Sequence, residues 1–208
     1  MDKIIIIGAG GHAKVLMDMI QQAGNFNLIG LVDKNFPADK KILGMPILGN
    51  DTILPDLLAQ GINLAVIGVG STKNNSIRKK LYEQTLRLGF VMPALIHPRA
   101  IIAKNVKIES GAQIMAGAII QTGVKIGRNT IINTGVQIDH DCLIGQNIHI
   151  APGAVLSGNV VVEDSAFVGA GATIIQNITI GQEAIVGAGA VVVKNVLAKT
   201  QVVGVPAK

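Results

Sequence analysis

The sequence predicts an α/β domain followed by a parallel β-solenoid, and three observations lead to this fold class. The chain opens with a short apolar run, a glycine-rich turn and a stretch with helical spacing. Residues 102–197 then divide into sixteen consecutive hexads without a slip or an insertion. Pro98 lies where the first pattern gives way to the second, so we expect an N-terminal domain over 1–97 and a solenoid domain over 98–208.

The first strand, turn and helix are expected within residues 3–20. Residues 3–7 form a continuous apolar run, as in a central strand of a parallel sheet. The turn Gly8-Ala-Gly-Gly-His12 follows, and apolar residues then recur at helical spacing. Glycines allow backbone N–H groups to approach a phosphate at a helix N-terminus, where the helix dipole also favours an anion. We therefore expect a small Rossmann-like domain that binds a nucleotide.

Candidate ligand contacts in this domain lie at the ends of its strands. A second strand over 28–32 ends in Asp33, at the distance from Gly8 where a nucleotide fold places an acid against a ribose hydroxyl. A third strand over 63–68 leads into a turn with Gly68 and Gly70. That turn lies at the edge where open α/β sheets bind their ligands.

Two other interpretations of the glycine-rich turn stay open. Gly8, Gly10 and Ala13 fit the pattern of a dinucleotide dehydrogenase. A domain that ends near residue 96 is short for that fold, however, and the chain continues in hexads, so a nucleotide-linked sugar is the better-fitting ligand. The other alternative is that the glycines only form a tight connection between strand and helix.

The remaining segments complete the sheet and helices of this domain. Residues 43–49 are expected to form a loop with a short edge element, residues 52–60 a short helix, and residues 90–98 a strand and a turn. Residues 75–88 predict an amphipathic helix with Ile77, Leu81 and Leu88 on its apolar side. Its basic residues are expected to form a solvated face; they are Arg78, Lys79, Lys80 and Arg87.

The hexads share one positional rule. The first residue is always Ile, Val or Leu, the fifth is modest in size and mostly apolar, and the fourth is Gly, Asn, Asp, Ser or Glu. Gly and Asn are the residues that best tolerate a positive φ angle, so each hexad predicts one short strand and one corner. Repeats of this kind predict a parallel β-helix with the first position in its interior.

Composition argues against several classes of protein. The basic residues are scattered, and four Phe and one Tyr are too few to stack nucleic-acid bases, so no nucleic-acid partner is expected. The net charge of +5 favours an anionic ligand such as a nucleotide or coenzyme A. No apolar run approaches the roughly 20 residues that cross a bilayer, and the N-terminus lacks a signal-peptide pattern. We expect a cytoplasmic protein without membrane insertion, and its single cysteine cannot form an internal disulfide.

The hexad at 138–143 departs from the rule and carries the candidate chemistry. It places Asp139, His140 and Asp141 in series, with His140 at the outward third position and Asp141 at the corner. A histidine flanked by carboxylates is a typical general base, because the acid orients the ring, fixes its tautomer and raises its basicity. The alternative is a solvated surface histidine. Cys142 stands at the inward fifth position, which disfavours a metal site or a cysteine nucleophile, so no metal is expected.

A second exception is His149, at the sixth position of its hexad. Two interpretations of this residue are equally open. Its side chain either completes a hydrogen bond in the wall of the solenoid or contacts an acyl donor.

Five motifs together extend over essentially the whole chain. They are the Gly8–His12 turn, Asn133-Thr-Gly, the Asp139–Cys142 segment, His149-Ile-Ala-Pro-Gly and the closing Gly204-Val-Pro-Ala. In these motifs the chain resembles the sugar O-/N-acetyltransferases of the NeuD/PglD type, which are left-handed β-helix hexapeptide acyltransferases. The resemblance implies a left-handed parallel β-helix with three hexads per triangular coil, so that residues eighteen apart stack. It also implies a homotrimer that holds acetyl-CoA, a co-substrate and not a resident cofactor, between neighbouring subunits.

The resemblance also implies roles for single residues. His140 followed by Asp141 matches the family's base, and His149, nine residues on, matches a histidine that contacts acetyl-CoA. We expect Asn133 to help position the base. Nucleotide-sugar contacts match Gly10, Gly11, His12, Asp33 and Gly68 or Gly70, and acetyl-CoA contacts match Gly158, Ala170 and Ala188.

The implied stacking gives these positions a physical meaning. Gly158 would lie one coil beyond His140, where its N–H could bind the thioester carbonyl and stabilise an oxyanion. Ala170 and Ala188 would stack as a track of small side chains for the pantetheine arm, beside the histidine and its acid.

The sequence thus predicts an acetyl-CoA-dependent N-acetyltransferase that modifies the 4-amino group of a UDP-linked sugar of the bacillosamine type. Direct attack by the amine is expected, because no exposed Cys or Ser stands beside His140 in the sequence. One alternative is an O-acetyltransferase for sialic acid or a related sugar. An alternative of another class is a non-catalytic scaffold that binds sugar nucleotides, against which the intact His140–Asp141 pair argues.

Overall fold

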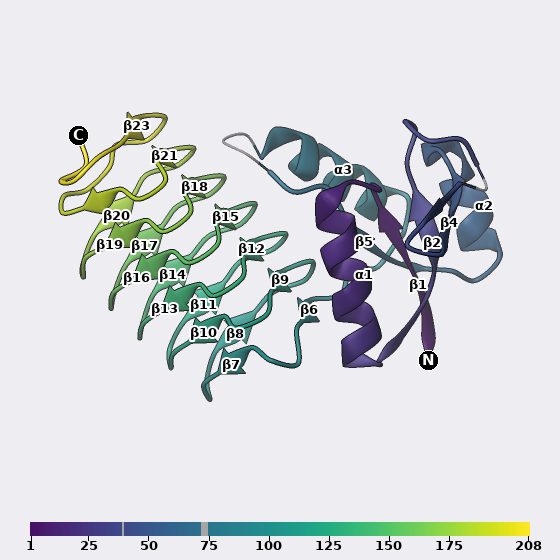
Figure 1. Ribbon diagram of the computed structural model, residues 1–208, viewed down its shortest axis with the longest axis horizontal. Coiled ribbons are helices and arrows are strands. Elements are labelled where there is room, and N and C mark those ends of the chain that lie inside the picture. The colour runs from purple at the N-terminus through teal and green to yellow at the C-terminus, as the bar shows by residue number, and fades with distance from the viewer. Residues whose placement is uncertain (39, 72–74) are drawn as a thin grey trace.

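The computed structural model describes residues 1–38, 40–71 and 75–208 and shows both parts that the sequence predicts. An α/β domain from the N-terminal part of the chain packs against a long solenoid that continues to the C-terminus (Figure 1). Within the described residues, no helix is long and apolar enough to cross a membrane.

The N-terminal domain is built on a mostly parallel sheet with the strand order β3-β4-β2-β1-β5. Its strands are β1 (Asp2–Ile7), β2 (Phe26–Val32), β3 (Lys41–Ile42), β4 (Met45–Gly49) and β5 (Leu64–Ile67). Residues 4–7 of the central strand β1 are at most 2% exposed, which explains the continuous apolar run at the start of the chain. β3 pairs antiparallel with β4 at the edge of the sheet, near the edge element expected over 43–49.

Helices cover both faces of this sheet. They are α1 (Gly11–Ala23), the 3-10 helix η1 (Asp51–Ile53), α2 (Leu54–Ala59) and α3 (Ser76–Arg87). α1 lies between the sheet and the solenoid, because one apolar cluster contains both Leu16 of α1 and Ile131 of the solenoid. α2 and α3 lie on the opposite face, where Leu57 and Tyr82 share a cluster with Ile7 of β1.

The prediction of a solvated basic face on α3 is wrong for one residue. Arg78 is only 2% exposed, whereas Ile77 on the expected apolar side is 66% exposed. The helix lies where the sheet meets the solenoid, and backbone carbonyl oxygens there need a donor. Arg78 donates from Nη1 to the carbonyl oxygens of Ile67 and Val69, at 2.9 and 3.0 Å, and from Nε to that of Asn129, at 3.2 Å.

The solenoid strands form three parallel sheets, one on each side of a triangular coil, which we call sheets 1, 2 and 3. Sheet 1 contains β7 (Ile101–Ile102), β10 (Ile119–Ile120), β13 (Gln137–Ile138), β16 (Val155–Leu156), β19 (Thr173–Ile174) and β22 (Val191–Val192). Sheet 2 contains β8 (Lys107–Ile108), β11 (Lys125–Ile126), β14 (Leu143–Ile144), β17 (Val161–Val162) and β20 (Thr179–Ile180). Sheet 3 contains β6 (Leu95–Ile96), β9 (Gln113–Ile114), β12 (Ile131–Ile132), β15 (His149–Ile150), β18 (Phe167–Val168), β21 (Ile185–Val186) and β23 (Gln201–Val202).

The hexad rule is confirmed up to the last hexad, where the register slips and Ile185 pairs with Gln201, sixteen residues on. Within sheet 1, Ile120 pairs with Ile138 and Ile138 with Leu156, so stacked residues are eighteen apart. These first-position side chains are at most 1% exposed and form the interior. The fourth position takes the left-handed backbone conformation, with φ of 56° at Asn129 and 60° at Asp141, and so turns the chain onto the next side.

Three edges join the sheets, and each is named here by the sheets that it connects. Edge 1–2 contains the turn between β13 and β14, edge 2–3 the turn between β14 and β15, and edge 3–1 the turn between β12 and β13. β6 already pairs with β9, so the solenoid pairing begins just ahead of Pro98, and the domain boundary after His97 stays a prediction.

Candidate active site

His140 and Asp141 lie on edge 1–2, as outward-facing residues of one turn. Nδ1 of His140 is 2.9 Å from Oδ2 of Asp141, and the backbone N–H of His140 donates to Oδ1 of Asp139 at 2.8 Å. Because a carboxylate accepts and cannot donate, Nδ1 carries the proton and Nε2 is left free to accept one. The hydrogen bond to Asp141 raises the pKa of His140 above its ordinary value, and the charges of Asp139 and Asp141 add to that effect.

Two glycines make room for this pair. A Cβ atom on Gly158, one coil after His140, would lie 2.6 Å from both Cε1 and Nε2 of the imidazole. A Cβ atom on Gly123, one coil before Asp141, would collide with the Asp141 carboxylate. The ring and its acid are therefore held between neighbouring coils that lack side chains at these positions, and the predicted proximity of Gly158 to His140 is confirmed.

The predicted acetyl-CoA track lies elsewhere in the same chain. Ala170 and Ala188 are exposed and follow one another on edge 3–1, with the N–H of Gly189 donating to the carbonyl oxygen of Ala170 at 2.8 Å. His140 and Gly158 are on edge 1–2, at the other border of sheet 1. The expectation that one chain places the track beside His140 is therefore wrong, because the two groups belong to different corners of the triangular coil.

Asn133 is also on edge 3–1, and it contacts His149 instead of the base. Its Nδ2 is 3.0 Å from Nε2 of His149, and its Oδ1 accepts from the N–H of Thr134 at 2.8 Å. Within one chain Asn133 therefore does not position His140 or Asp141, contrary to the expectation from the sequence.

His149 connects the solenoid to the N-terminal domain. Its side chain is 7% exposed, and Nδ1 lies 2.8 Å from the carbonyl oxygen of Ser71 and 3.0 Å from Ser71 Oγ. The ring of Phe167, one coil further along sheet 3, meets the imidazole edge to face with centroids 5.5 Å apart. Burial, more than the nearby Arg78 charge, lowers the pKa of His149 to about 4, so the ring is neutral.

His12 reaches the same space from the N-terminal domain. Its Nε2 is 2.7 Å from Oε1 of Gln113 on strand β9, and burial lowers its pKa to about 4. A cavity of about 360 Å³ lies between the two domains at this point. Its described lining residues are Gly11, His12, Val15, Gly70, Ser71, Asn133 and His149.

The expected nucleotide contacts divide into two groups. Asp33 lines a second cavity of about 550 Å³ at the carboxyl ends of β1, β2 and β5, and its Oδ2 accepts from the N–H of Ala9 at 2.8 Å. Gly70 lines the cavity between the domains, next to His12. Gly68 is a packing glycine, since a Cβ there would collide with a methyl carbon of Ile6. The end of that turn, residues 72–74, lies outside the described residues.

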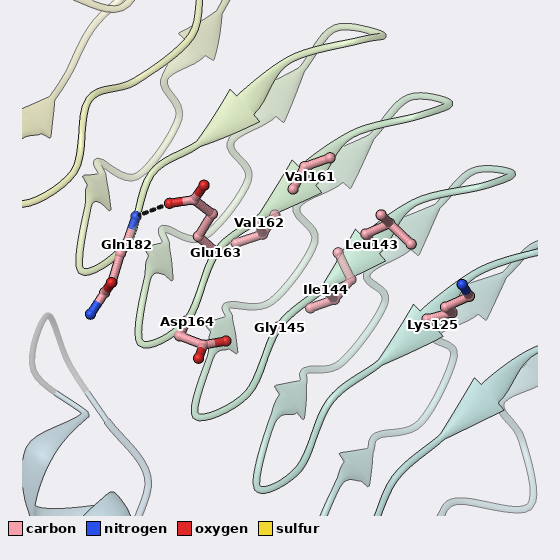
Figure 2. Close-up of a pocket in the computed structure, with 9 residues that line it drawn as sticks. All are labelled: Lys125, Leu143, Ile144, Gly145, Val161, Val162, Glu163, Asp164 and Gln182. Atoms are coloured by element: carbon pink, nitrogen blue, oxygen red, sulfur yellow. Dashed lines mark hydrogen bonds between the residues drawn. The ribbon is translucent and has the colours of Figure 1, made fainter.

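A third hollow lies on the outer face of sheet 2, apart from the cavity between the domains and the cavity beside Asp33 (Figure 2). It measures about 530 Å³. Figure 2 shows Leu143 and Val161 along its strands and Glu163 turned toward Gln182, whose N–H donates to Glu163 at 2.8 Å. None of the residues predicted for the site is among its described lining residues.

Comparison with known proteins gives a consistent result along the chain. A family model described as the PglD N-terminal domain matches residues 3–85, and one described as bacterial transferase hexapeptide (six repeats) matches 105–140 and 123–158. A crystal structure of a perosamine N-acetyltransferase from Caulobacter crescentus is 37% identical, with a TM-score of 0.94, and the match covers 100% of this chain and 96% of that one. That protein is a variant with one histidine replaced by asparagine, in complex with CoA and GDP-perosamine. This chain belongs to the PglD-type sugar acetyltransferases.

Two further relatives support this assignment, and with it the left-handed β-helix fold class. The acetyltransferase domain of PglB from Neisseria gonorrhoeae FA1090 is 35% identical, with a TM-score of 0.93 over 100% of this chain and 99% of that chain. A UDP-N-acetylbacillosamine N-acetyltransferase from Bacillus subtilis (strain 168) is 40% identical over 125 residues, or 56% of this chain. That match spans 52% of the Bacillus protein, about half of its length.

Sequence reasoning missed three residues that organise this PglD-type site. Arg78, Gln113 and Ser71 act through hydrogen bonds between segments far apart in the chain, to Asn129, Ile67 and His149 respectively. Gln113 stands at the same hexad position as His149, two coils earlier on sheet 3. A second polar residue at this position was the one sequence signal that could have pointed to Gln113.

The contact between Gly158 and His140 predicts a change in titration. In a Gly158→Ala variant the added methyl group displaces the ring from Asp141, so the pKa of His140 should fall toward its ordinary value. The backbone of Gly158 is not in the left-handed region, so the fold tolerates alanine there. NMR titration of the His140 ring measures the effect, with Ser157→Ala as a neighbouring control that leaves the titration unchanged. An unaltered His140 titration in Gly158→Ala would contradict the placement of the ring.

Proposed function

We propose that this protein transfers the acetyl group of acetyl-CoA to the amino group of a nucleotide-linked amino sugar, with His140 as the general base. The observation that carries the proposal is the hydrogen-bonded His140–Asp141 pair with an unprotonated Nε2 beside the bare backbone of Gly158. The relatives named as perosamine and UDP-N-acetylbacillosamine N-acetyltransferases support the reaction class. A complex of the PglB domain with acetyl coenzyme A supports the donor.

The geometry supports direct attack on the thioester. The sugar amine forms the new C–N bond, and its proton passes to Nε2 of His140, whose imidazolium form Asp141 stabilises. The thioester carbonyl oxygen becomes an oxyanion, and the N–H of Gly158, beside the His140 ring, is the proposed donor to it. The oxyanion then collapses, the C–S bond breaks, and the proton held by His140 goes to the departing coenzyme A thiolate. Cys142 takes no part, because it is buried and burial raises its pKa to about 11.

The N-terminal domain supplies binding surfaces for the nucleotide sugar. Gly10 and Gly11 open helix α1, and a Cβ built on either glycine would meet none of the described atoms within 4 Å. A diphosphate can therefore approach the helix N-terminus, where backbone N–H groups and the dipole favour it. The nucleoside would then lie in the cavity beside Asp33, and the sugar in the cavity between the domains.

The separation of the two edges supports a donor site shared between subunits. Three copies around a threefold axis, each with sheet 1 facing inward, bring edge 1–2 of one copy against edge 3–1 of the next. His140 of one subunit would then face Asn133, Ala170 and the cavity between the domains of its neighbour. The outward residues of sheet 1 suit this packing, since most are apolar; they are Ile101, Ile119, Gln137, Val155, Thr173 and Val191.

The reaction class is tested with a panel of acceptors. Acetyl-CoA is incubated with UDP-, GDP- and TDP-linked amino sugars, and the release of free thiol is followed. We expect turnover with at least one amino sugar, none with the matching hydroxy sugar, and a loss of roughly 10²- to 10⁴-fold in His140→Ala. Near-normal turnover in His140→Ala would rule out the assignment of the base, and acetylation of hydroxy sugars alone would identify an O-acetyltransferase.

The raised pKa of His140 predicts a pH effect. The base acts when unprotonated, so kcat should fall as the pH drops through the pKa of His140. Asp141→Asn removes the main cause of the raised pKa, so the acid limb of the kcat profile should move to lower pH. The plateau should also fall by roughly tenfold or more, because the ring is less well oriented. Asn tolerates the left-handed backbone at this corner, and Asp139→Asn is the matched control, with a smaller shift in the same direction.

Mixed trimers test whether two subunits share the site. His140→Ala removes the base on edge 1–2, and Ala188→Trp blocks the track on edge 3–1. We expect each variant alone to be nearly inactive. Co-expressed in equal amounts, the two should recover about a quarter of the wild-type activity, because random assembly leaves that fraction of sites with both edges intact. No recovery in mixed trimers of confirmed composition would show that the two edges do not act together.

A further inference from the structure

The cavity between the domains contains two imidazoles that the acid–base step does not use, those of His12 and His149. We infer that Gln113 is a positioning residue that fixes His12 as a hydrogen-bond acceptor, so that this cavity takes a neutral donor group, a hydroxyl or amino group of the bound sugar. The inference rests on the proposed function for the identity of the ligand. The state of the imidazoles themselves is a property of the free protein.

The orientation of the Gln113 amide determines the tautomer of His12. Nε2 of Gln113 donates to the carbonyl oxygen of Ile67 at 3.0 Å, so its Oε1 faces the other way. That oxygen lies 2.7 Å from Nε2 of His12, and because an amide oxygen only accepts, His12 must carry its proton on Nε2. Nδ1 of His12 is then a lone pair. The amide cannot reverse this assignment, since a flipped Gln113 would place its oxygen against the carbonyl of Ile67.

The second imidazole has the opposite tautomer. Nδ1 of His149 lies 2.8 Å from the carbonyl oxygen of Ser71, which can only accept, so the proton is on Nδ1. Nε2 of His149 faces Nδ2 of Asn133 at 3.0 Å and accepts from it. The N–H of Thr134 donates to Oδ1 of Asn133 and so fixes that amide as well. Both histidines therefore have an unprotonated nitrogen that is determined by a partner from elsewhere in the chain, but that of His149 already accepts from Asn133, so the acceptor considered for the ligand is Nδ1 of His12.

Both rings are also neutral. The charged and titratable groups that face His12 are Arg78 of α3 and His149 of β15, and both disfavour a second positive charge there. Gln113 of β9 is 1% exposed and uncharged, so it offers no compensating carboxylate. The described lining of the cavity contains no Asp or Glu. Burial and these neighbours lower the pKa of His12 to about 4, well below neutral pH.

The consequence is a selective polar surface. A phosphate or a carboxylate placed against His12 would meet the lone pair of Nδ1, and an ammonium group would lose its hydration without gaining a counter-charge. A hydroxyl or a neutral amine can donate to Nδ1 of His12. Gln113 belongs to the solenoid and His12 to the N-terminal domain, so the docking of the two domains is what creates this acceptor.

The test combines tautomer measurement with kinetics. In wild-type protein, ¹⁵N NMR of the imidazole rings should show His12 as the Nε2–H tautomer and His149 as the Nδ1–H tautomer from about pH 5.5 to 8. The chain has four histidines, which single His→Gln variants assign. Gln113→Leu should remove the preference of His12 for the Nε2–H tautomer. It should also raise the KM for the sugar nucleotide by about tenfold or more, with the KM for acetyl-CoA unchanged.

Gln113→Glu separates positioning from a merely structural role. Its carboxylate stabilises the imidazolium form of His12, so Nδ1 becomes a donor at low pH. The KM for the sugar nucleotide should then rise as the pH falls and recover as it increases, a dependence that the wild type lacks. The controls are Gln201→Glu and Gln201→Leu, at the exposed equivalent position on sheet 3. Both should leave the tautomer of His12 and the KM for the sugar nucleotide at their wild-type values.

Each outcome decides one question. A wild-type His12 that carries its proton on Nδ1, or that titrates near pH 6.5, refutes the inference whatever the variants do. If the KM of Gln113→Glu for the sugar nucleotide does not depend on pH, as in the wild type, the positioning role is refuted. If the predicted tautomers are found but no amino sugar is acetylated by the wild type, the proposed function fails while the assignment of the acceptor stands.

Discussion

The stacking of residues eighteen apart is the constraint on which the rest of this structure depends. Each coil pairs with its neighbours through short parallel strands, so any residue has a fixed neighbour one coil before and one coil after it. The site uses that constraint directly. His140 needs an empty position at 158, and Asp141 needs one at 123, and both positions are glycine. A single inserted residue between coils would bring a side chain into one of these spaces.

The docking of the N-terminal domain depends on a buried cation that is held by backbone oxygens. Among the described residues no carboxylate pairs with Arg78, and burial lowers its pKa to about 9, so the guanidinium remains charged at neutral pH. Carbonyl oxygens from the end of β5, from the turn that follows it and from edge 2–3 accept its hydrogen bonds. Its Nη2 has no partner among the described residues, which costs on the order of 1–3 kcal/mol. The carbonyl oxygen of Ile67 accepts from both Arg78 and Gln113. Arg78, which holds the N-terminal domain, and Gln113, which orients His12 in the cavity, therefore belong to one hydrogen-bond network.

Those features that depend on local sequence could be predicted, and those that depend on docking could not. The hexads specify strand, corner and interior within six residues, and the His140–Asp141 pair is formed by adjacent residues. Arg78 was misassigned because an amphipathic pattern assumes that a helix has one apolar neighbour, whereas α3 also meets unpaired carbonyl oxygens. Asn133 and the two alanines were expected beside His140 because spacing along the chain gives the coil but not which of its three edges a residue occupies. The tautomers of His12 and His149 are determined by Gln113 and Ser71, about 101 and 78 residues away in the chain, and sequence spacing alone does not connect them.

In the proposed function, the three histidines divide two chemical tasks according to their surroundings. His140 is exposed, pairs with a carboxylate and has a raised pKa, which suits a group that must gain a proton and then lose it. His12 and His149 have lowered pKa values because burial and Arg78 oppose their charge, which suits groups that must stay neutral while they hold a substrate. If His12 gained a proton near neutral pH, the cavity would lose the acceptor at Nδ1 of His12. Placing the basic histidine on the outer edge and the neutral pair between the domains keeps proton transfer apart from recognition. In the proposed trimer, a neighbouring subunit would then bring the base to a sugar that is already bound.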